Sequence, residues 1–255
     1  MKNLKFEIKE NGIGVLTLSR PEKHNAFNPA LLEELSFFLD KEKNNQALRL
    51  LIITGSGNKS FSSGVDLKAL LDFKNIEDAR DFAILLESTS EKIFNFPKPT
   101  IALINGYALG GGFGYAAACD MRIMVDTAKA GFPAIKLGAI LPVTCTLYLN
   151  AIIGIGHARD LLLTGRLLDA NEALKIGMVN RVFPAESIWE ETYKIANTIL
   201  EGNDTAITYT KKTVNHSLLK EIEAQKLYAA DNFAYLSQTE EWQKRMRNFA
   251  NRKKD

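Results

Sequence analysis

Apolar and polar residues alternate near the start of the chain, first over Leu4–Ile8 and then over residues 15–18. A period of two is the spacing of a half-buried β-strand, and the intervening Asn11-Gly12 is typical of a tight turn, so this region predicts a hairpin. Further along, short apolar runs without alternation predict strands that are buried on both faces. These runs cover residues 48–53, Thr100–Ile104 and Met121–Val125.

Apolar residues spaced three and four positions apart predict helices between the strands. Asn28-Pro29 is a typical helix start, and apolar residues then recur on one face as far as Leu39. Strands alternate with helices in the first half of the chain, which predicts an α/β fold with parallel sheets covered by helices. After Pro142 only residues 179–183 are expected to form a strand. The other predicted helices cover residues 67–71, 78–94, 143–153, 171–176, 186–200, 205–217, 219–234 and 240–250, with a loop at 75–76.

Two glycine-rich turns each follow one of the buried strands. In the first, residues 54–68 read Thr-Gly-Ser-Gly-Asn-Lys-Ser-Phe-Ser-Ser-Gly-Val-Asp-Leu-Lys. In the second, Asn105-Gly106 turns the chain, and the glycines at 110–114 are expected to open an alanine-rich helix that runs to about Cys119. Glycines let a ligand approach the backbone, and the first N–H groups of a helix lack internal partners. Such donors suit a phosphate or a developing oxyanion.

Three interpretations compete for the second turn. A dinucleotide-binding loop needs Gly-x-Gly-x-x-Gly in an early strand–helix unit with an acid about twenty residues later. A phosphate loop needs Lys-Ser/Thr after the glycines, and the second turn has neither pattern. Close packing of helices would explain the glycines and alanines without any ligand. An oxyanion hole would need a second N–H donor, which the turn at residues 54–68 supplies.

Composition bounds the class of protein. The 255 residues are 46% hydrophobic and 24% charged, which is ordinary for one large globular domain or a domain with a helical appendage. The formal net charge of +2 gives no indication of nucleic-acid binding, and no apolar run is long enough to span a membrane. The N-terminus lacks the continuous apolar core of a signal peptide, so we expect a cytoplasmic protein.

Cysteines and histidines are few and scattered. Cys119 and Cys145, the only cysteines, both lie in apolar surroundings, which favours buried thiols in a reducing compartment over a disulfide. His24, His157 and His216 lie far apart with no partner at ligand spacing, so we expect no metal site.

The two glycine turns together resemble those of the crotonase (enoyl-CoA hydratase/isomerase) superfamily. Its first motif typically reads Phe-x-x-Gly-Ala-Asp-Leu, and its second reads Asn-Gly-x-Ala-x-Gly-Gly-Gly. Residues 20–26, Arg-Pro-Glu-Lys-His-Asn-Ala, are similar to its N-terminal signature, and residues 163–166 and 170–180 to its later landmarks. The resemblance covers nearly the whole chain. It implies a ββα-spiral α/β core over residues 1–190 and a helical trimerisation region over residues 191–255.

The resemblance also implies the residues that would bind an acyl-CoA thioester. The backbone N–H groups of Gly111 and of Val65, which replaces the usual alanine, would stabilise negative charge on the thioester oxygen. No cofactor is expected apart from coenzyme A as part of the substrate, and the expected assembly is a trimer or a dimer of trimers, without nucleic-acid or membrane partners. The implied binding residues are Lys23, His24 and Ala26 at the nucleotide, Ser63 and Gly64 at the pantetheine, Lys68 at the phosphates, and Phe233 and Arg252 from the adjacent subunit.

The two catalytic glutamates of the family have no counterpart in this chain. The position three residues after the oxyanion glycine holds Gly114, and the other glutamate position holds Ala134. The turn after Leu137-Gly138, where other subgroups place an aspartate and most relatives carry Pro-Gly-Ala-Gly-Gly, also departs from the pattern over residues 139–146. Because neither glycine nor alanine transfers a proton, we do not expect ordinary hydration by two carboxyl groups.

Two functions from different classes follow. The first is a crotonase-type enzyme that acts on an acyl-CoA or acyl-carrier thioester by stabilising an enolate, with non-standard acid and base groups. Decarboxylation is its most natural subtype, because loss of CO2 forms the enolate without a carboxylate base. The second is a catalytically silent acyl-CoA binder or an assembly partner of an active paralogue. The paired glycine turns favour the enzyme, and the missing glutamates favour the binder.

Overall fold

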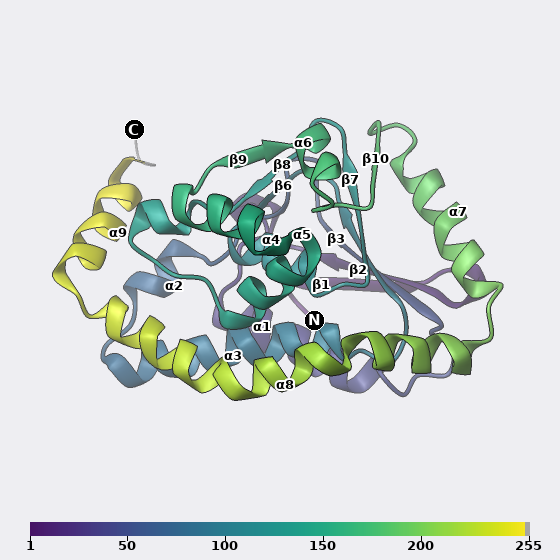
Figure 1. Ribbon diagram of the computed structural model, residues 1–255, viewed down its shortest axis with the longest axis horizontal. Helices are drawn as coiled ribbons and strands as arrows, with labels where there is room; N and C mark the ends of the chain where they lie inside the picture. Colours follow the sequence, from purple (N-terminus) through teal and green to yellow (C-terminus); the bar gives the residue numbers. More distant parts are fainter. Residues whose placement is uncertain (253–255) are drawn as a thin grey trace.

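The computed structural model describes residues 1–252, with side chains for residues 1–249 and Asn251. Its strands form two sheets, with the orders β1-β2-β3-β5-β7-β10 and β4-β6-β8-β9 (Figure 1). The larger sheet contains β1 (Leu4–Ile8), β2 (Ile13–Leu18), β3 (Leu50–Gly55), β5 (Thr100–Ile104), β7 (Met121–Val125) and β10 (Arg181–Phe183). The smaller sheet contains β4 (Ser60–Ser62), β6 (Tyr107–Leu109), β8 (Lys129–Gly131) and β9 (Leu167–Asp169).

The larger sheet confirms the strands predicted from hydrophobic patterning. β1 and β2 form the expected antiparallel hairpin, with Leu4 opposite Leu18. The remaining neighbours, β2–β3, β3–β5, β5–β7 and β7–β10, are parallel. Every residue of β3 and β5 is buried, as expected for parallel strands covered on both faces.

The smaller sheet was not predicted. Each of its strands is only three residues long, too short to show a period of two. β4, β6 and β8 follow β3, β5 and β7 directly, so the chain repeats a strand, a second short strand and then a helix. This repeat confirms the ββα spiral. Glycine permits the turn before β6, because a Cβ on Gly106 would lie 2.6 Å from the backbone nitrogen of Ser60.

The helices agree with the predicted positions more closely than with the predicted ends. The side chain of Asn75 accepts a hydrogen bond from the Asp78 N–H, so this residue caps a helix that starts at Ile76, where a loop was expected. The helix after the second glycine turn stops at Ala117, before Cys119, and the two helices expected at 205–217 and 219–234 are one. The helices are α1 (Pro29–Glu42), α2 (Leu67–Leu71), α3 (Ile76–Phe94), α4 (Gly111–Ala117), α5 (Val143–Thr164), α6 (Ala170–Lys175), α7 (Ile188–Leu200), α8 (Asp204–Ser237) and α9 (Glu240–Arg252), with 3-10 turns η1 (Glu10–Gly12), η2 (Pro21–Lys23) and η3 (Pro133–Leu137).

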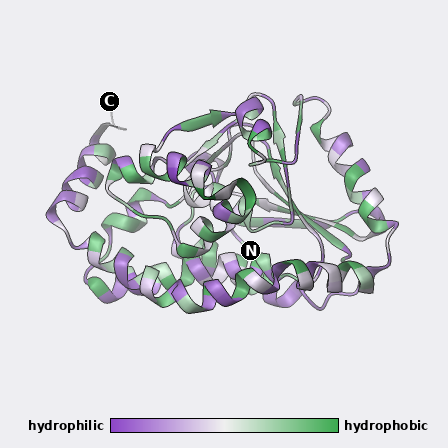
Figure 2. Ribbon diagram, in the orientation of Figure 1, coloured by the Kyte–Doolittle hydropathy of each residue, from purple (hydrophilic) through white to green (hydrophobic). Residues whose placement is uncertain are grey.

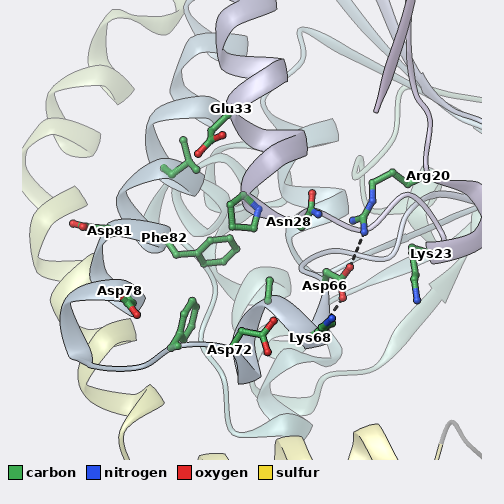
Figure 3. A pocket seen from close by; sticks show the side chains of 14 residues that line it. Arg20, Lys23, Asn28, Glu33, Asp66, Lys68, Asp72, Asp78, Asp81 and Phe82 are labelled. Carbon is green, nitrogen blue, oxygen red and sulfur yellow. Dashed lines mark hydrogen bonds and ion pairs between the residues drawn. The ribbon is translucent and has the colours of Figure 1, made fainter. Parts of the chain in front are cut away.

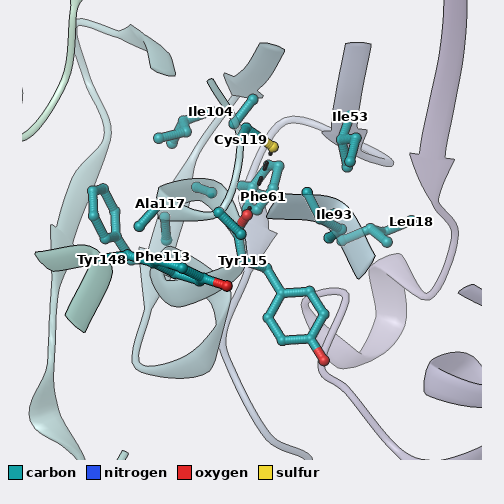
Figure 4. Packing of buried hydrophobic residues seen from close by; sticks show 14 of the residues in the cluster. Leu18, Ile53, Phe61, Ile93, Ile104, Phe113, Tyr115, Ala117, Cys119 and Tyr148 are labelled. Atoms are coloured by element: carbon teal, nitrogen blue, oxygen red, sulfur yellow. Dashed lines mark hydrogen bonds between the residues drawn. The ribbon is translucent and has the colours of Figure 1, made fainter. Parts of the chain in front are cut away.

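Helix α4 lies at the centre of the hydrophobic core. All of its residues are buried, and it contacts both sheets as well as α3 and α5. Apolar residues concentrate on the strands and on the inward helix faces, and Figure 2 shows polar residues on the outward faces. Figure 4 shows Phe113, Tyr115 and Tyr148 gathered in this core, where the Tyr115 hydroxyl donates to the Leu86 carbonyl at 2.9 Å. The start of α4 is therefore fixed by packing on several sides.

The predicted helical C-terminal region is present, and it packs on its own chain. α8 runs along α3 and also contacts α5, while α9 packs against α2 and η3 (Figure 1). Within residues 1–252, no helix has the length and apolar character needed to cross a membrane.

Candidate active site

The two glycine turns meet at Gly64 and Gly111. Gly64 has a positive φ of 90°, and a Cβ there would lie 2.7 Å from the Leu109 carbonyl oxygen and 3.3 Å from the Gly111 nitrogen. On the other side, Cγ2 of Val65 lies 3.9 Å from the position of a Cβ on Gly111. The structure thus brings together the two segments that sequence analysis paired.

The backbone N–H groups of Val65 and Gly111 are unpaired. Among the described residues, neither group donates a hydrogen bond. The backbone around Val65 is nevertheless fixed, because Phe27 donates to the Gly64 carbonyl and accepts from the Asp66 N–H, both at 2.8 Å. Two unpaired donors on neighbouring fixed segments are suited to stabilise one oxygen that gains negative charge.

An ion pair joins the N-terminal signature to the Val65 turn. Nη2 of Arg20 lies 3.0 Å from Oδ2 of Asp66, and these side chains are only 12% and 16% exposed. The same guanidinium donates through Nη1 to the Ala26 carbonyl at 2.5 Å. The buried Asn25 side chain adds a bond to the Ser60 carbonyl at 2.8 Å. Sequence analysis did not assign Arg20 or Asp66 a role, although their opposite charges in two neighbouring motifs were a usable signal.

A cavity of about 700 Å³ lies beside this ion pair. Figure 3 shows Arg20, Lys23 and Lys68 on one side of it, and Phe82 toward the other. Lys23 and Lys68, which are far apart in the sequence, are therefore brought to one cavity. The acidic residues Glu33, Asp72, Asp78 and Asp81 also line it.

Three other expected binding residues, His24, Ala26 and Ser63, are bonded within the N-terminal signature and the first glycine turn. The His24 carbonyl accepts from the Ser63 N–H at 3.0 Å, and Nδ1 of His24 lies 3.2 Å from Oγ of Ser60. Ala26 is buried, and its carbonyl accepts the Arg20 bond described above. None of His24, Ala26 and Ser63 lines the cavity itself.

Phe233, which the resemblance implies completes the site of an adjacent subunit, lies on α8 near the cavity of its own chain. Its ring is 8% exposed and packs 6.4 Å from the ring of Phe73, which lines the cavity of the same chain. Within the single chain, Phe233 thus supports the wall of this cavity. Arg252 ends α9, and its side chain lies outside the described residues.

The structure has no carboxyl group at either expected glutamate position. A Cβ on Gly114 would overlap Sγ of Cys145 and lie 2.8 Å from its Cβ, so position 114 has no room for a larger side chain. Ala134 is half-buried in η3. Both cysteines are buried free thiols, as predicted. Burial raises the pKa of Cys119 to about 12 and raises the pKa of Cys145 well above its ordinary value, so both thiols stay protonated at neutral pH.

Comparisons with known proteins agree on one family. A family model described as enoyl-CoA hydratase/isomerase matches residues 8–255. A crotonyl-CoA hydratase from Syntrophomonas wolfei is 35% identical, over 96% of this chain and 94% of its own length. A short-chain-enoyl-CoA hydratase from Clostridium acetobutylicum is 32% identical over the same shares. The crystal structure of an enoyl-CoA hydratase from Bacillus halodurans superposes with a TM-score of 0.90 at 30% identity, covering 96% of this chain and 99% of that one.

Proposed function

The chain belongs to the enoyl-CoA hydratase/isomerase family of the crotonase superfamily, and we propose that it acts on acyl-CoA thioesters at the site formed by Val65 and Gly111. The observation that carries this proposal is the pair of unpartnered N–H groups on segments in contact through Gly64. Both N–H groups donate to the thioester oxygen and hold it while it gains negative charge. Loss of one such donor typically costs about 3 kcal/mol of transition-state stabilisation.

Coenzyme A is held in the cavity beside the Arg20–Asp66 ion pair. Lys23 and Lys68 offer cations to its phosphates, and charge-assisted bonds of this kind are among the strongest polar contacts in proteins. The Arg20–Asp66 ion pair fixes the nucleotide-side segment against the turn that carries Val65, so coenzyme A binding and oxyanion stabilisation share one framework.

Because positions 114 and 134 hold glycine and alanine, proton transfer in this enzyme does not use carboxyl groups at these two positions. Of the reactions that pass through a thioester enolate, decarboxylation fits this site best. In that reaction the bond between the α-carbon and the carboxylate breaks, CO2 leaves, and the electron pair passes into the enolate. The thioester oxygen then carries the charge against the two N–H groups, and a proton from water completes the α-carbon. This route requires no carboxylate base.

A silent acyl-CoA binder is the second candidate, and one observation favours it. The Cys145 thiol fills the space beside Gly114 and is protonated, so it replaces the glutamate sterically and not chemically. An assay panel separates the two candidates. Calorimetry with acetyl-, crotonyl- and malonyl-CoA should detect binding of at least one thioester, and loss of CO2 from a malonyl-type thioester supports the enzyme. Binding without any turnover supports the silent binder, and no binding to any thioester contradicts both.

We further propose that the protein assembles as a trimer or a dimer of trimers. Apolar and aromatic side chains on α8 are open to solvent in the single chain, including Tyr209 at 63%, Val214 at 72% and Tyr228 at 70% exposure. Single exposed apolar side chains are common, but several of them along one helix are available for contact with other subunits. Light scattering at micromolar concentration should give a mass that is a multiple of three subunits, and a clean monomer contradicts this assembly.

A further inference from the structure

Glu87 is a buried acid to which the proposed reaction gives no role. It lies on α3 and is 3% exposed, and no described cation forms an ion pair with it. Its two carboxylate oxygens accept backbone hydrogen bonds from Val143 at 2.5 Å and from Thr144 at 3.0 Å. Burying a carboxylate without a cation is costly, so its position calls for a physical reason.

The carboxylate of Glu87 caps helix α5 from a distant part of the chain. The first N–H groups of a helix need acceptors, and the residue before α5 is Pro142, whose side chain offers none. Glu87 provides two acceptors from 56 positions earlier in the sequence. A negative charge at this end of a helix is also favoured by the helix dipole.

The capped turn of α5 packs directly on the first turn of α4. Sγ of Cys145 takes the place of a Cβ on Gly114, and Cδ2 of Leu141 lies 3.9 Å from the position of a Cβ on Gly110. Residues 141–145 therefore lie along the start of α4, between the N-cap Gly110 and Gly114. Gly111, which carries one of the two unpaired N–H groups, lies in the chain between these two contact positions, and its own nearest neighbours are Phe27 and Val65.

We propose that Glu87 is a positioning residue of the active site. As a carboxylate it holds the first turn of α5 against α4 and keeps the Gly111 N–H directed at the thioester oxygen, and its protonation loosens this arrangement. The inference rests on the function proposed above for Val65 and Gly111. It predicts that binding of thioesters weakens as the pH falls.

The surroundings of Glu87 favour protonation at a higher pH than for an ordinary glutamate. Its pKa is raised chiefly by burial, and the bonds from α5 offset this only in part. The titratable groups that face it are Glu91 on the same helix, Tyr115 on α4, and Cys145 and Tyr148 on α5. The last three have raised pKa values and stay neutral, and Glu91 raises the pKa of Glu87 further.

The test compares the full-length wild type with Glu87→Gln, Glu87→Leu and the control Glu91→Gln between pH 5 and pH 8.5. Calorimetry measures the affinity for acetyl-CoA, and hydrogen–deuterium exchange measures the protection of a peptide that spans residues 139–149. Wild-type affinity should fall with pH, with a midpoint above that of an ordinary glutamate. Glu87→Gln should bind roughly tenfold more weakly at pH 8 and without this pH dependence, because misplaced donors lose much of their effect. Glu91→Gln should keep the plateau affinity and move the midpoint to lower pH.

The possible results separate the two proposals. If the wild type binds acetyl-CoA and Glu87→Gln shows the same affinity and pH profile, Glu87 is only structural and this inference is overturned, whatever its effect on exchange. Reduced protection of residues 139–149 in Glu87→Leu, together with weaker binding, supports it. If the wild type binds no thioester at any pH, the proposed function itself fails, and the exchange measurement alone then decides whether Glu87 holds α5.

Discussion

Sγ of Cys145 lies only 2.0 Å from the position that a Cβ on Gly114 would take. Cys145 lies in the first turn of α5, in the segment that departs from the family pattern, and Gly114 lies at a position where that pattern has a glutamate. A small residue on α4 thus faces a larger one on α5, which is the size exchange that the resemblance implies. The contact is closely packed, and position 114 offers no carboxyl group.

A double-mutant cycle tests this exchange. Gly114→Ala should destabilise the fold by about 1–3 kcal/mol, because the added methyl group overlaps the thiol of Cys145. Combining it with Cys145→Gly should recover much of that loss, and the energies should be non-additive. Urea unfolding measures all three variants. Gly156→Ala is the control, since a Cβ at Gly156 meets no atom within 4 Å, and it should not destabilise the protein. Additive energies at 114 and 145 would count against the exchange.

Crotonyl-CoA hydration should be very slow in the wild type. Each general acid or base typically contributes a hundred- to ten-thousand-fold, and neither Gly114 nor Ala134 supplies one. Gly114→Glu alone should not restore hydration, because Cys145 fills the space. The triple variant Gly114→Glu, Ala134→Glu, Cys145→Gly should gain activity, measured as loss of the enoyl absorbance. Wild-type hydration at a rate typical of the relatives would mean that another residue serves as acid or base.

The Arg20–Asp66 ion pair should matter for both stability and coenzyme A binding. Arg20→Met leaves a mostly buried carboxylate unpaired and releases the Ala26 carbonyl, so we expect a loss of about 2 kcal/mol, less than for a fully buried pair. The affinity for coenzyme A should also fall. Arg166→Met is the control: Arg166 pairs with Asp160 at 2.8 Å and with Glu172 at 3.2 Å, but these side chains are 40–50% exposed, so its removal should cost less than about 1 kcal/mol. Similar losses in the two variants would contradict a role for Arg20 in joining the motifs.

Protonation of Glu87 should stabilise the fold, although it weakens the binding of thioesters. A carboxyl group whose pKa is raised on folding stabilises the fold below its unfolded pKa, and this contribution is lost as the pH rises through the folded value. Relative to Glu87→Gln, the wild type should therefore gain stability as the pH falls, while its binding of thioesters weakens. Urea unfolding from pH 5 to pH 8 measures the difference. If the stability of the wild type relative to Glu87→Gln instead rises with pH, the pKa of Glu87 in the fold is lower than its burial implies.

Hydrophobic patterning was sufficient to predict the larger sheet and most helices. Strands such as β3 and β5 are continuous apolar runs, and α1 begins at its predicted cap, with Oδ1 of Asn28 accepting from the Leu31 N–H at 3.0 Å. The short strands β4, β6, β8 and β9 are too short to show a hydrophobic period. Their positions are set by the preceding strand and the turn. The apolar pattern predicts two helices where α8 is continuous, because that pattern is interrupted near residue 218. Packing along α3 overrides this interruption.

The candidate site was predictable only where its function lies in the backbone or in local motifs. The Val65 and Gly111 turns could be paired because each follows a buried strand and because the two motifs together resemble those of the crotonase superfamily. Glu87 could not be identified, because its partners Val143 and Thr144 lie 56 and 57 positions away and are reached through backbone atoms. The overlap between Gly114 and Cys145 depends on the α4–α5 contact, which the sequence does not encode locally.

The most direct test of the central claim is the carbonyl stretching frequency of acetyl-CoA, labelled with 13C at its thioester carbon, when bound to the wild type, Gly111→Ala and Gly111→Pro. Gly111 is the first residue of α4, where proline is well tolerated, and a Cβ there meets its nearest atoms at 3.9 Å, so both variants should fit. Only the proline variant removes the N–H. We predict a lowered frequency in the wild type and in Gly111→Ala, and in Gly111→Pro a smaller shift and about a hundred- to thousandfold lower turnover. A wild-type frequency equal to that of free acetyl-CoA in water, or a Gly111→Pro spectrum identical to the wild type, would contradict the account.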